Sequence, residues 1–252
     1  MLTRDQAICL RAVDYSETSQ ILTFFTRQHG KLAAIAKGSK RPKSGFGGPV
    51  ERLARGEILF VSSQTGQLAT LTEFQQVHDV TSALSTDLDA YYAGLLGTEL
   101  LTKLSQEHEP RVELFDRFQE FLLSITQVVV RRESKQQLMG LLIVFQLALL
   151  RDGGILPKFT GCVNCDLALS DGWQAVYFSS DANGLICQDC EMSFPQRTLL
   201  PSSVASTLSD LRQLPQVSYE TVRFTERLLI AHFTDLLHQR PKMAKFLELG
   251  EG

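Results

Sequence analysis

Four cysteines are the residues in this chain with the clearest potential for chemistry. They form two Cys-x-x-Cys pairs, Cys162–Cys165 and Cys187–Cys190, which are separated by residues 166–186. Each pair can direct two sulfur atoms at one ion from a tight turn, and four thiolates in a tetrahedral array suit Zn²⁺. The spacing therefore predicts one structural zinc ion per chain, bound by Cys162, Cys165, Cys187 and Cys190.

Other uses of these cysteines stay open at this point. The alternatives are a disulfide pair, free thiols or an iron–sulfur cluster. A catalytic zinc is disfavoured because four protein ligands leave no open position for water. Two neighbouring Cys-x-x-Cys pairs also favour a ligand set over a redox motif. The fifth cysteine, Cys9, lies inside a strand-like run and is predicted to be a core residue.

A basic, glycine-rich segment, residues 37–48, is the second candidate site. It has four cations within seven residues, which could follow a phosphate backbone, and one aromatic side chain that could stack on a base. Arg11 and Lys31 could extend the patch from neighbouring strands. The alternative is an ordinary solvated loop, and the segment lacks the spacing of a phosphate-binding P-loop. The predicted DNA-binding residues are Arg11, Lys31, Lys37, Lys40, Arg41, Lys43 and Phe46.

Charge is distributed unevenly along the chain. The net charge is −3, from 25 basic and 28 acidic residues, which argues against a generic nucleic-acid binder. However, residues 1–80 contain 10 basic and 7 acidic residues, whereas the remainder contains 15 and 21. Because the excess of positive charge is confined to one region, it indicates a site there for a negatively charged partner.

The elements that must position these residues change in kind near residue 80. Before it, five short strand-like runs and one long loop predict a small closed barrel, with the OB-fold preferred over an SH3-like barrel. The predicted strands are residues 7–13, 20–26, 31–36, 57–62 and 68–77. After residue 80, apolar residues recur at three- and four-residue steps, which predicts helices. We expect an α+β chain with a barrel domain over residues 1–80 and a helical domain over residues 81–252. An irregular zinc-binding insert is expected at about 156–195.

Signals for catalysis and for membranes are weak. The motifs GxSxG, HExxH and GxGxxG are absent, and the histidines and carboxylates are scattered, so no catalytic residues are nominated and we expect no enzymatic activity. The longest apolar run, residues 138–150, is too short to span a bilayer. Charged residues interrupt any secretory signal at the start. We therefore expect a cytoplasmic, nucleoid-associated protein.

The order of these parts resembles the bacterial RecO family of DNA repair proteins. The likeness begins in the first strands and continues through the cysteine segment, with its glycine before the second pair, to residues 240–246. The matching elements of the first region are Tyr15 with Glu17, Phe25-Thr26, Gly30-Lys31, Lys37-Gly38 and Lys40-Arg41.

The resemblance implies a DNA repair and recombination mediator without catalytic turnover. Such proteins bind single- and double-stranded DNA, anneal complementary strands and contact the acidic, apolar tail of the single-stranded DNA-binding protein (SSB). With RecR they help RecA to load on gapped DNA. The tail needs an apolar groove and a cation for its carboxylate, and Arg131 and Arg132 are the candidate cations. The alternative for this pair is a helix C-terminus stabilised by its dipole.

Two other functions stay open. One is a zinc-braced interaction adaptor whose barrel does not bind DNA, and the other is a nucleic-acid enzyme with an unrecognised site.

Overall fold

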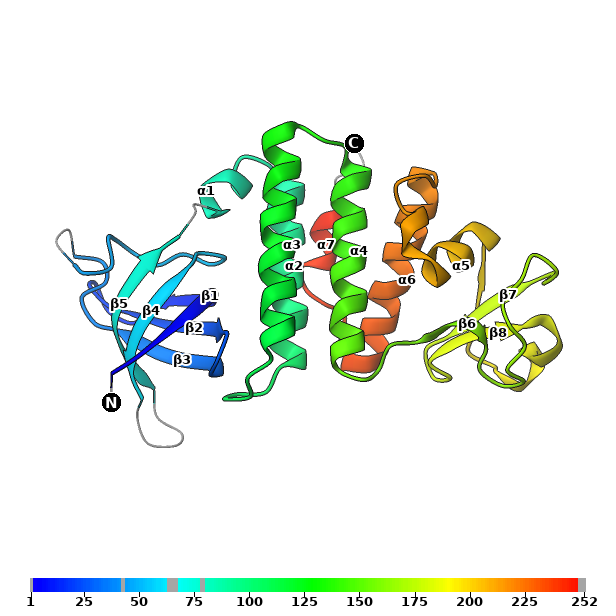
Figure 1. Cartoon of the computed structure of the whole chain (residues 1–252), viewed down its shortest axis with the longest axis horizontal. Helices are drawn as coiled ribbons and strands as arrows, with labels where there is room; N and C mark the ends of the chain where they lie inside the picture. Colours follow the sequence, from blue (N-terminus) through cyan, green and yellow to red (C-terminus); the bar gives the residue numbers. More distant parts are fainter. Residues whose placement is uncertain (1, 42–43, 63–67, 78–79, 249–252) are drawn as a thin grey trace. The chain divides into compact units, whose positions relative to one another are not determined.

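A computed structural model describes residues 2–41, 44–62, 68–77 and 80–248. The chain divides into two compact units, Met1–Arg132 and Glu133–Gly252. The first unit contains the strands β1 to β5 and the helices α1 to α3, and the second contains all the later elements (Figure 1). The first two long helices therefore group with the strands, and not with the helices that follow them.

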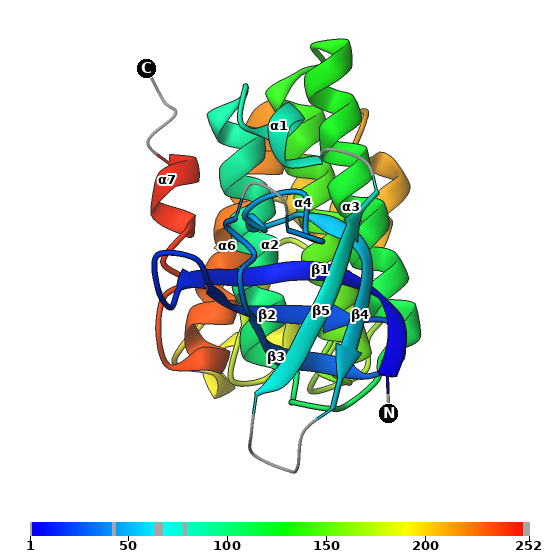
Figure 2. The ribbon, with the colours of Figure 1, turned by 90° about the vertical axis from the view of Figure 1, so that its left-hand side faces the viewer.

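Five strands close into a barrel in the order β1-β2-β3-β5-β4, as expected for the OB-fold (Figure 2). Strand β1 begins five residues earlier than the sequence indicates, because its first half pairs with β4 and its second half pairs with β2. The strands are β1 Leu2–Asp14, β2 Gln20–Thr26, β3 Gly30–Ala36, β4 Arg55–Val61 and β5 Ala69–Gln76.

The barrel interior is filled from alternating strand positions. In β3 every second residue is buried, from Gly30 through Ala36, which is the pattern of a half-buried strand. Phe24 and Phe74 meet across the core with ring centroids 5.9 Å apart. Cys9 is fully buried in the same cluster, as predicted, and burial raises the pKa of its thiol to about 12. This packed interior leaves the ends and outer face of the barrel for contacts.

Three helices complete the first unit: α1 Val80–Leu84, α2 Leu88–Leu104 and α3 Val112–Arg131. Asp87 caps α2 by accepting a hydrogen bond from the Ala90 amide, at 2.9 Å. The barrel is joined to α3 by a two-pronged ion pair, in which Arg27 donates to both oxygens of Asp116 at 2.9 Å. The Arg27–Asp116 pair therefore links β2 and the turn after it to α3.

The helices of the second unit are α4 Lys135–Asp152, α5 Ser202–Ser209, α6 Tyr219–Leu237 and α7 Ala244–Glu248, with a short 3-10 turn, η2, at Leu211–Gln213. Ser134 and Gln137 form a reciprocal capping box at the start of α4. Asp210 is both the C-cap of α5 and the N-cap of η2, so α5 ends at Ser209.

The cysteine-bearing segment is a sheet and not an irregular insert. Its strands, in the order β6-β8-β7-β9, are β6 Lys158–Cys162, β7 Val176–Ser179, β8 Gly184–Cys187 and β9 Thr198–Leu200, and a 3-10 turn, η1, covers Gln188–Ser193. Strands of three to five residues are too short to show a clear periodicity, so the sequence pattern missed them. Strand β9 lies beyond the predicted end of the insert at residue 195.

Among the described helices, none has the length and apolar character needed to cross a membrane.

Candidate metal centre and nucleic-acid interface

The four predicted cysteines come together at one point of the second unit. Their sulfur atoms all lie within 4.8 Å of one another, and the Sγ atoms of Cys165 and Cys187 are 3.7 Å apart. A tetrahedron with Zn–S bonds of about 2.3 Å has sulfurs about 3.8 Å apart. A cubane cluster would hold its cysteines farther apart, because each binds a different iron. The donor set therefore fits a single tetrahedral ion.

The sheet places both Cys-x-x-Cys turns. Cys162 ends β6 and Cys187 ends β8, and these two strands run parallel. The Val163 amide donates to the Leu185 carbonyl at 2.8 Å, which fastens the first turn to β8. A side chain at Gly184 would place its Cβ 2.6 Å from Val163, so this close approach requires glycine. The glycine before the second pair is thus part of the metal-site architecture.

Electrostatics at the four sulfurs favour partial ionisation before any metal binds. Burial opposes ionisation of Cys162, but backbone amides of Cys165, Cys187 and Asn164 donate to its sulfur and lower its pKa to about 6. Burial raises the pKa of Cys187 to about 12. The local environment thus favours the thiolate of Cys162, whereas it favours the protonated thiol of Cys187 until a cation compensates the negative charge.

The basic loop begins at the end of the barrel sheet where β1 ends, β2 begins and β3 ends. The buried side chain of Gln20 holds this loop in place. Its Oε1 accepts from the Ser39 hydroxyl at 3.1 Å and from the Val50 amide at 2.9 Å, and its Nε2 donates to the Val50 carbonyl at 3.2 Å. One glutamine therefore fixes both ends of the long connection between β3 and β4.

The loop cations differ in their availability. Lys37 and Arg41 are exposed, and the structure pairs neither side chain with an acid among the described residues. Lys40 is bound to Asp14, with its Nζ 2.7 Å from the carboxylate. Lys43 lies outside the described residues. Phe46 is half-buried and packs against the barrel core, so only part of its ring is accessible.

Arg11 and Lys31 lie on different strands of the barrel, and only Arg11 lies near the basic loop. Arg11 is exposed on β1, three residues before the end of that strand beside the loop. Lys31 is the second residue of β3, so it lies roughly 20 Å along the strand from the loop. Its ammonium donates to the carbonyls of Ser105 at 2.9 Å and Thr102 at 3.3 Å. Lys31 therefore caps the C-terminal end of α2, and the structure does not bring it to the loop cations.

The two candidate cations for a protein tail lie at the end of α3. Arg131 occupies the last helical turn, and Arg132 follows in the left-handed conformation with φ 54°. Both are exposed, and the neighbouring Val130 is 64% exposed. The position combines positive charge with apolar surface, and it also fits the ordinary preference for cations at a helix C-terminus.

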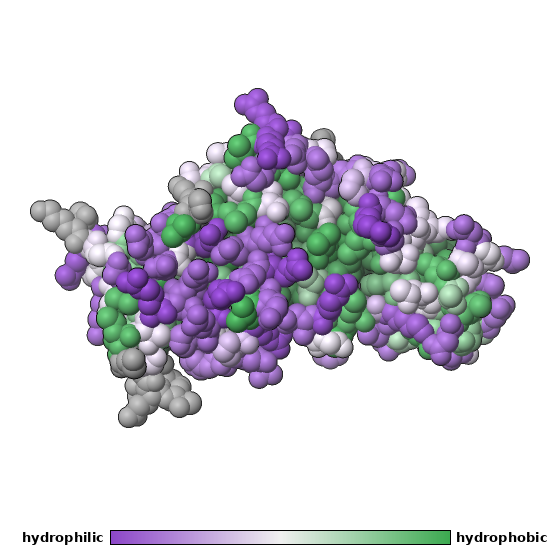
Figure 3. Space-filling model, in the orientation of Figure 1, coloured by the Kyte–Doolittle hydropathy of each residue, from purple (hydrophilic) through white to green (hydrophobic). Residues whose placement is uncertain are grey.

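A further apolar surface, missed from the sequence, follows α4. Gly140, Leu141, Val144 and Ala148 recur on one face of this helix, and Arg151 lies on the same face one turn later. Val144 is 45% exposed, and hydrophobic surface is visible along α4 in Figure 3. The helix is apolar almost all round, so its periodicity does not separate the exposed face from the buried one.

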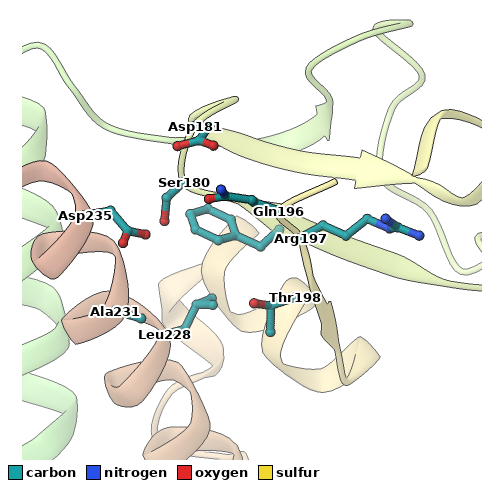
Figure 4. A pocket seen from close by; sticks show the side chains of 9 residues that line it. Ser180, Asp181, Gln196, Arg197, Thr198, Leu228, Ala231 and Asp235 are labelled. Carbon is teal, nitrogen blue, oxygen red and sulfur yellow. The ribbon is translucent and has the colours of Figure 1, made fainter. Parts of the chain in front are cut away.

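A pocket of about 260 Å³ also lies in the second unit. Asp181 and Asp235 stand on its rim, and the Arg197 guanidinium points away from it (Figure 4). That guanidinium lies over the Tyr177 ring, 5.4 Å from its centroid. None of the residues predicted from the sequence to bind metal, DNA or a protein tail lines the pocket. The lining residues are Phe178, Ser180, Asp181, Gln196, Arg197, Thr198, Leu228, Ala231 and Asp235.

Comparison with known proteins covers both halves of the chain. Residues 1–79 match the family model "Recombination protein O N terminal", and residues 85–237 match "Recombination protein O C terminal". DNA repair protein RecO of Myxococcus xanthus is 28% identical over 248 residues, covering 96% of each chain. DNA repair protein RecO of Bacillus subtilis is 28% identical, and the match covers 98% of this chain and 94% of that protein. DNA repair protein RecO of Alkaliphilus metalliredigens is 31% identical, and the match covers 75% of this chain and 72% of that protein. The chain therefore belongs to the RecO family of DNA repair proteins.

Proposed function

We propose that this chain is a recombination mediator that binds single- and double-stranded DNA and anneals complementary strands. It contacts the SSB tail and, with RecR, helps RecA to load on gapped DNA. Strand annealing makes and breaks no covalent bond, so the proposal requires no catalytic residues. Family membership supports the repair role, and the exposed cations of the basic loop carry the proposal for DNA binding.

The described part of the loop suits phosphate binding because Lys37 and Arg41 are exposed while hydrogen bonds hold the backbone at Gly38 and Lys40. Lys37 and Arg41 extend into solvent, and the buried Gln20 anchors the connection behind them. A preorganised loop loses less conformational entropy on binding than a mobile one. Each phosphate that it neutralises releases counterions, which makes the affinity depend on salt.

Salt titration tests this proposal directly. Three or four phosphate contacts predict a log–log slope of roughly −2 to −3 for a single strand, at about −0.7 per contact. Replacing Lys37 and Arg41 together with alanine should make the slope shallower by about 1.4. An unchanged slope and affinity would remove the loop from the DNA site and favour the adaptor function. Replacing Arg117 and Glu120, an exposed ion pair on α3, with alanine is the matched control.

We assign the cysteine site to one structural Zn²⁺ ion. The four sulfur atoms would hold it, and its charge would stabilise the thiolates that burial disfavours. Its role is to cross-link β6 and β8 with the η1 turn, a sheet whose strands have only three to five residues. Metal analysis should find about one zinc per chain.

The SSB tail is proposed to bind the helical part of the chain. Two surfaces offer the required apolar contact and cation. They are the end of α3 with Val130, Arg131 and Arg132, and the exposed face of α4 that ends at Arg151. Titrating a labelled peptide of the acidic tail against Arg132→Ala and Arg151→Ala separates them, because only the variant at the true site should lose affinity.

A further inference from the structure

Tyr15 is the one exposed residue among the 21 aromatic side chains, all of which the structure describes. The residue is 64% exposed at the turn between β1 and β2. Exposing a large amphipathic ring gives up the free energy of burial that the other aromatics gain. The turn itself is closed, since the Tyr15 amide donates to the Ser19 carbonyl at 2.9 Å and the Ser16 amide to the same oxygen at 3.2 Å. The ring is therefore presented on a fixed backbone.

This turn and the basic loop form one continuous edge of the barrel. The Lys40 amide donates to the Thr18 carbonyl at 3.1 Å, and the Gly38 amide donates to the Ser19 hydroxyl at 3.2 Å. The Lys40 side chain also binds Asp14, the residue immediately before Tyr15. Three hydrogen-bonded links thus hold the turn that carries Tyr15 beside the segment that carries Lys37 and Arg41.

We propose that Tyr15 is the base-stacking residue of the DNA site and that it makes the site prefer single strands with accessible bases. The inference rests on the proposed DNA-binding function. Sites that bind single strands combine a cationic track for the backbone with an aromatic face for the bases. Lys37 and Arg41 provide the first and Tyr15 provides the second. Phe46 fits this role less well because its ring packs on the barrel core.

Duplex DNA offers no exposed base face to Tyr15, because its bases are stacked within the helix. The ring therefore contributes to single-strand affinity alone, whereas the loop cations contribute to both forms. Tyr15 determines the preference between the two substrates, and the cations determine the salt dependence.

The experiment compares three labelled probes by fluorescence anisotropy: a thymidine oligonucleotide, an abasic strand of equal length, and a duplex. The abasic strand keeps the phosphates and lacks the bases. Tyr15→Ala should lower affinity for the thymidine strand roughly tenfold, within the range for loss of one stacked base. It should leave the abasic strand and the duplex unchanged. Tyr15→Phe, which keeps the ring, should bind like the parent.

Val13→Ala is the matched control, because it removes exposed apolar surface two residues away on β1. Equal thymidine affinity for Tyr15→Ala and the parent would overturn the inference and leave the proposed DNA binding intact. Loss of the base-dependent affinity in Phe46→Leu alone would also overturn it. A parent protein that binds neither strand would instead refute the proposed function itself.

Discussion

Single residues of the barrel use their charges in two different ways. The Lys31 ammonium donates hydrogen bonds to the carbonyls at the end of α2, and the Lys40 ammonium pairs with the exposed carboxylate of Asp14. Lys37 and Arg41 have no acidic partner among the residues that the structure describes. Two of these four cations thus have intramolecular contacts, which a count of basic residues does not reveal.

Removing the acid that competes for Lys40 should strengthen DNA binding. Asp14→Asn releases Lys40 for a phosphate, and an exposed pair of this kind is worth about 0.2–1 kcal/mol, so affinity should rise by about 1.4- to fivefold. Glu17→Gln removes the same charge from the same turn without releasing Lys40, so it should give a smaller gain. Equal gains in the two variants, measured by anisotropy at one salt concentration, would mean that only net charge matters.

Lys31 and Lys37 should separate stability from DNA affinity. Lys31→Met removes two charge-assisted hydrogen bonds and should lower the free energy of unfolding by roughly 1.5–3 kcal/mol, with no change in the salt slope of DNA binding. Lys37→Met should leave the free energy of unfolding unchanged and make the salt slope of DNA binding shallower. Urea unfolding and salt titration of both variants test this. A shallower salt slope in Lys31→Met would mean that Lys31 contacts a DNA phosphate, which would contradict this assignment.

The residue roles could be predicted from sequence only where spacing alone defines the contact. Within each Cys-x-x-Cys pair the short spacing alone places two sulfur atoms close together, so the cluster of four cysteines was predicted correctly. Lys31 meets Ser105 across a separation of 74 residues, and Phe46 turns toward a core that forms only when the barrel closes. Such long-range contacts leave no local signal, and the exposure of Tyr15 could not be inferred for the same reason.

The elements around the cysteines depend on one another for stability. Strands β6 to β9 are short, and the two cysteine turns lie at the ends of β6 and β8. The register of β6 with β8 includes only two residue pairs, so the bound ion is expected to supply much of the folding free energy of this sheet. The barrel, in contrast, has a closed hydrogen-bond ladder and its own core.

Cys187→Ser should therefore remove the metal and destabilise the second unit by several kcal/mol, while the barrel keeps its DNA contacts. Cys9→Ser is the matched control, since it changes a buried cysteine of the barrel and should leave about one zinc per chain. Metal analysis and thermal unfolding of both variants provide the readout. A Cys187→Ser protein as stable as the parent would contradict the bracing role.

Zinc binding at these elements should release protons. Although burial opposes it, backbone amide donors lower the pKa of Cys162 and favour its thiolate, whereas burial raises the pKa of Cys187 and favours its protonated form. Since the ion binds thiolates, the Cys187 proton must leave, and affinity should rise with pH and fall on acidification. Calorimetric titrations of metal-free protein in buffers of different ionisation enthalpy measure the release. Zero proton release at pH 7 would contradict this assignment.

The whole molecule combines a barrel that carries the excess of positive charge with a more acidic remainder. Residues 1–80 have 10 basic and 7 acidic residues, against 15 and 21 in residues 81–252. This polarity should orient DNA toward the barrel and leave the helical part for protein contacts. The predicted five-stranded closed barrel agrees with the structure, whereas the grouping of α2 and α3 with the barrel came only from tertiary contacts.

The measurement that tests the central claim most directly is the annealing of complementary oligonucleotides coated with SSB, followed by fluorescence quenching. The account predicts that the parent protein accelerates annealing, that Lys37→Ala with Arg41→Ala removes most of the acceleration, and that deletion of the SSB tail also removes it. Folded, zinc-loaded protein that gives no acceleration would contradict the mediator function. The basic loop would then be a solvated turn on an interaction adaptor.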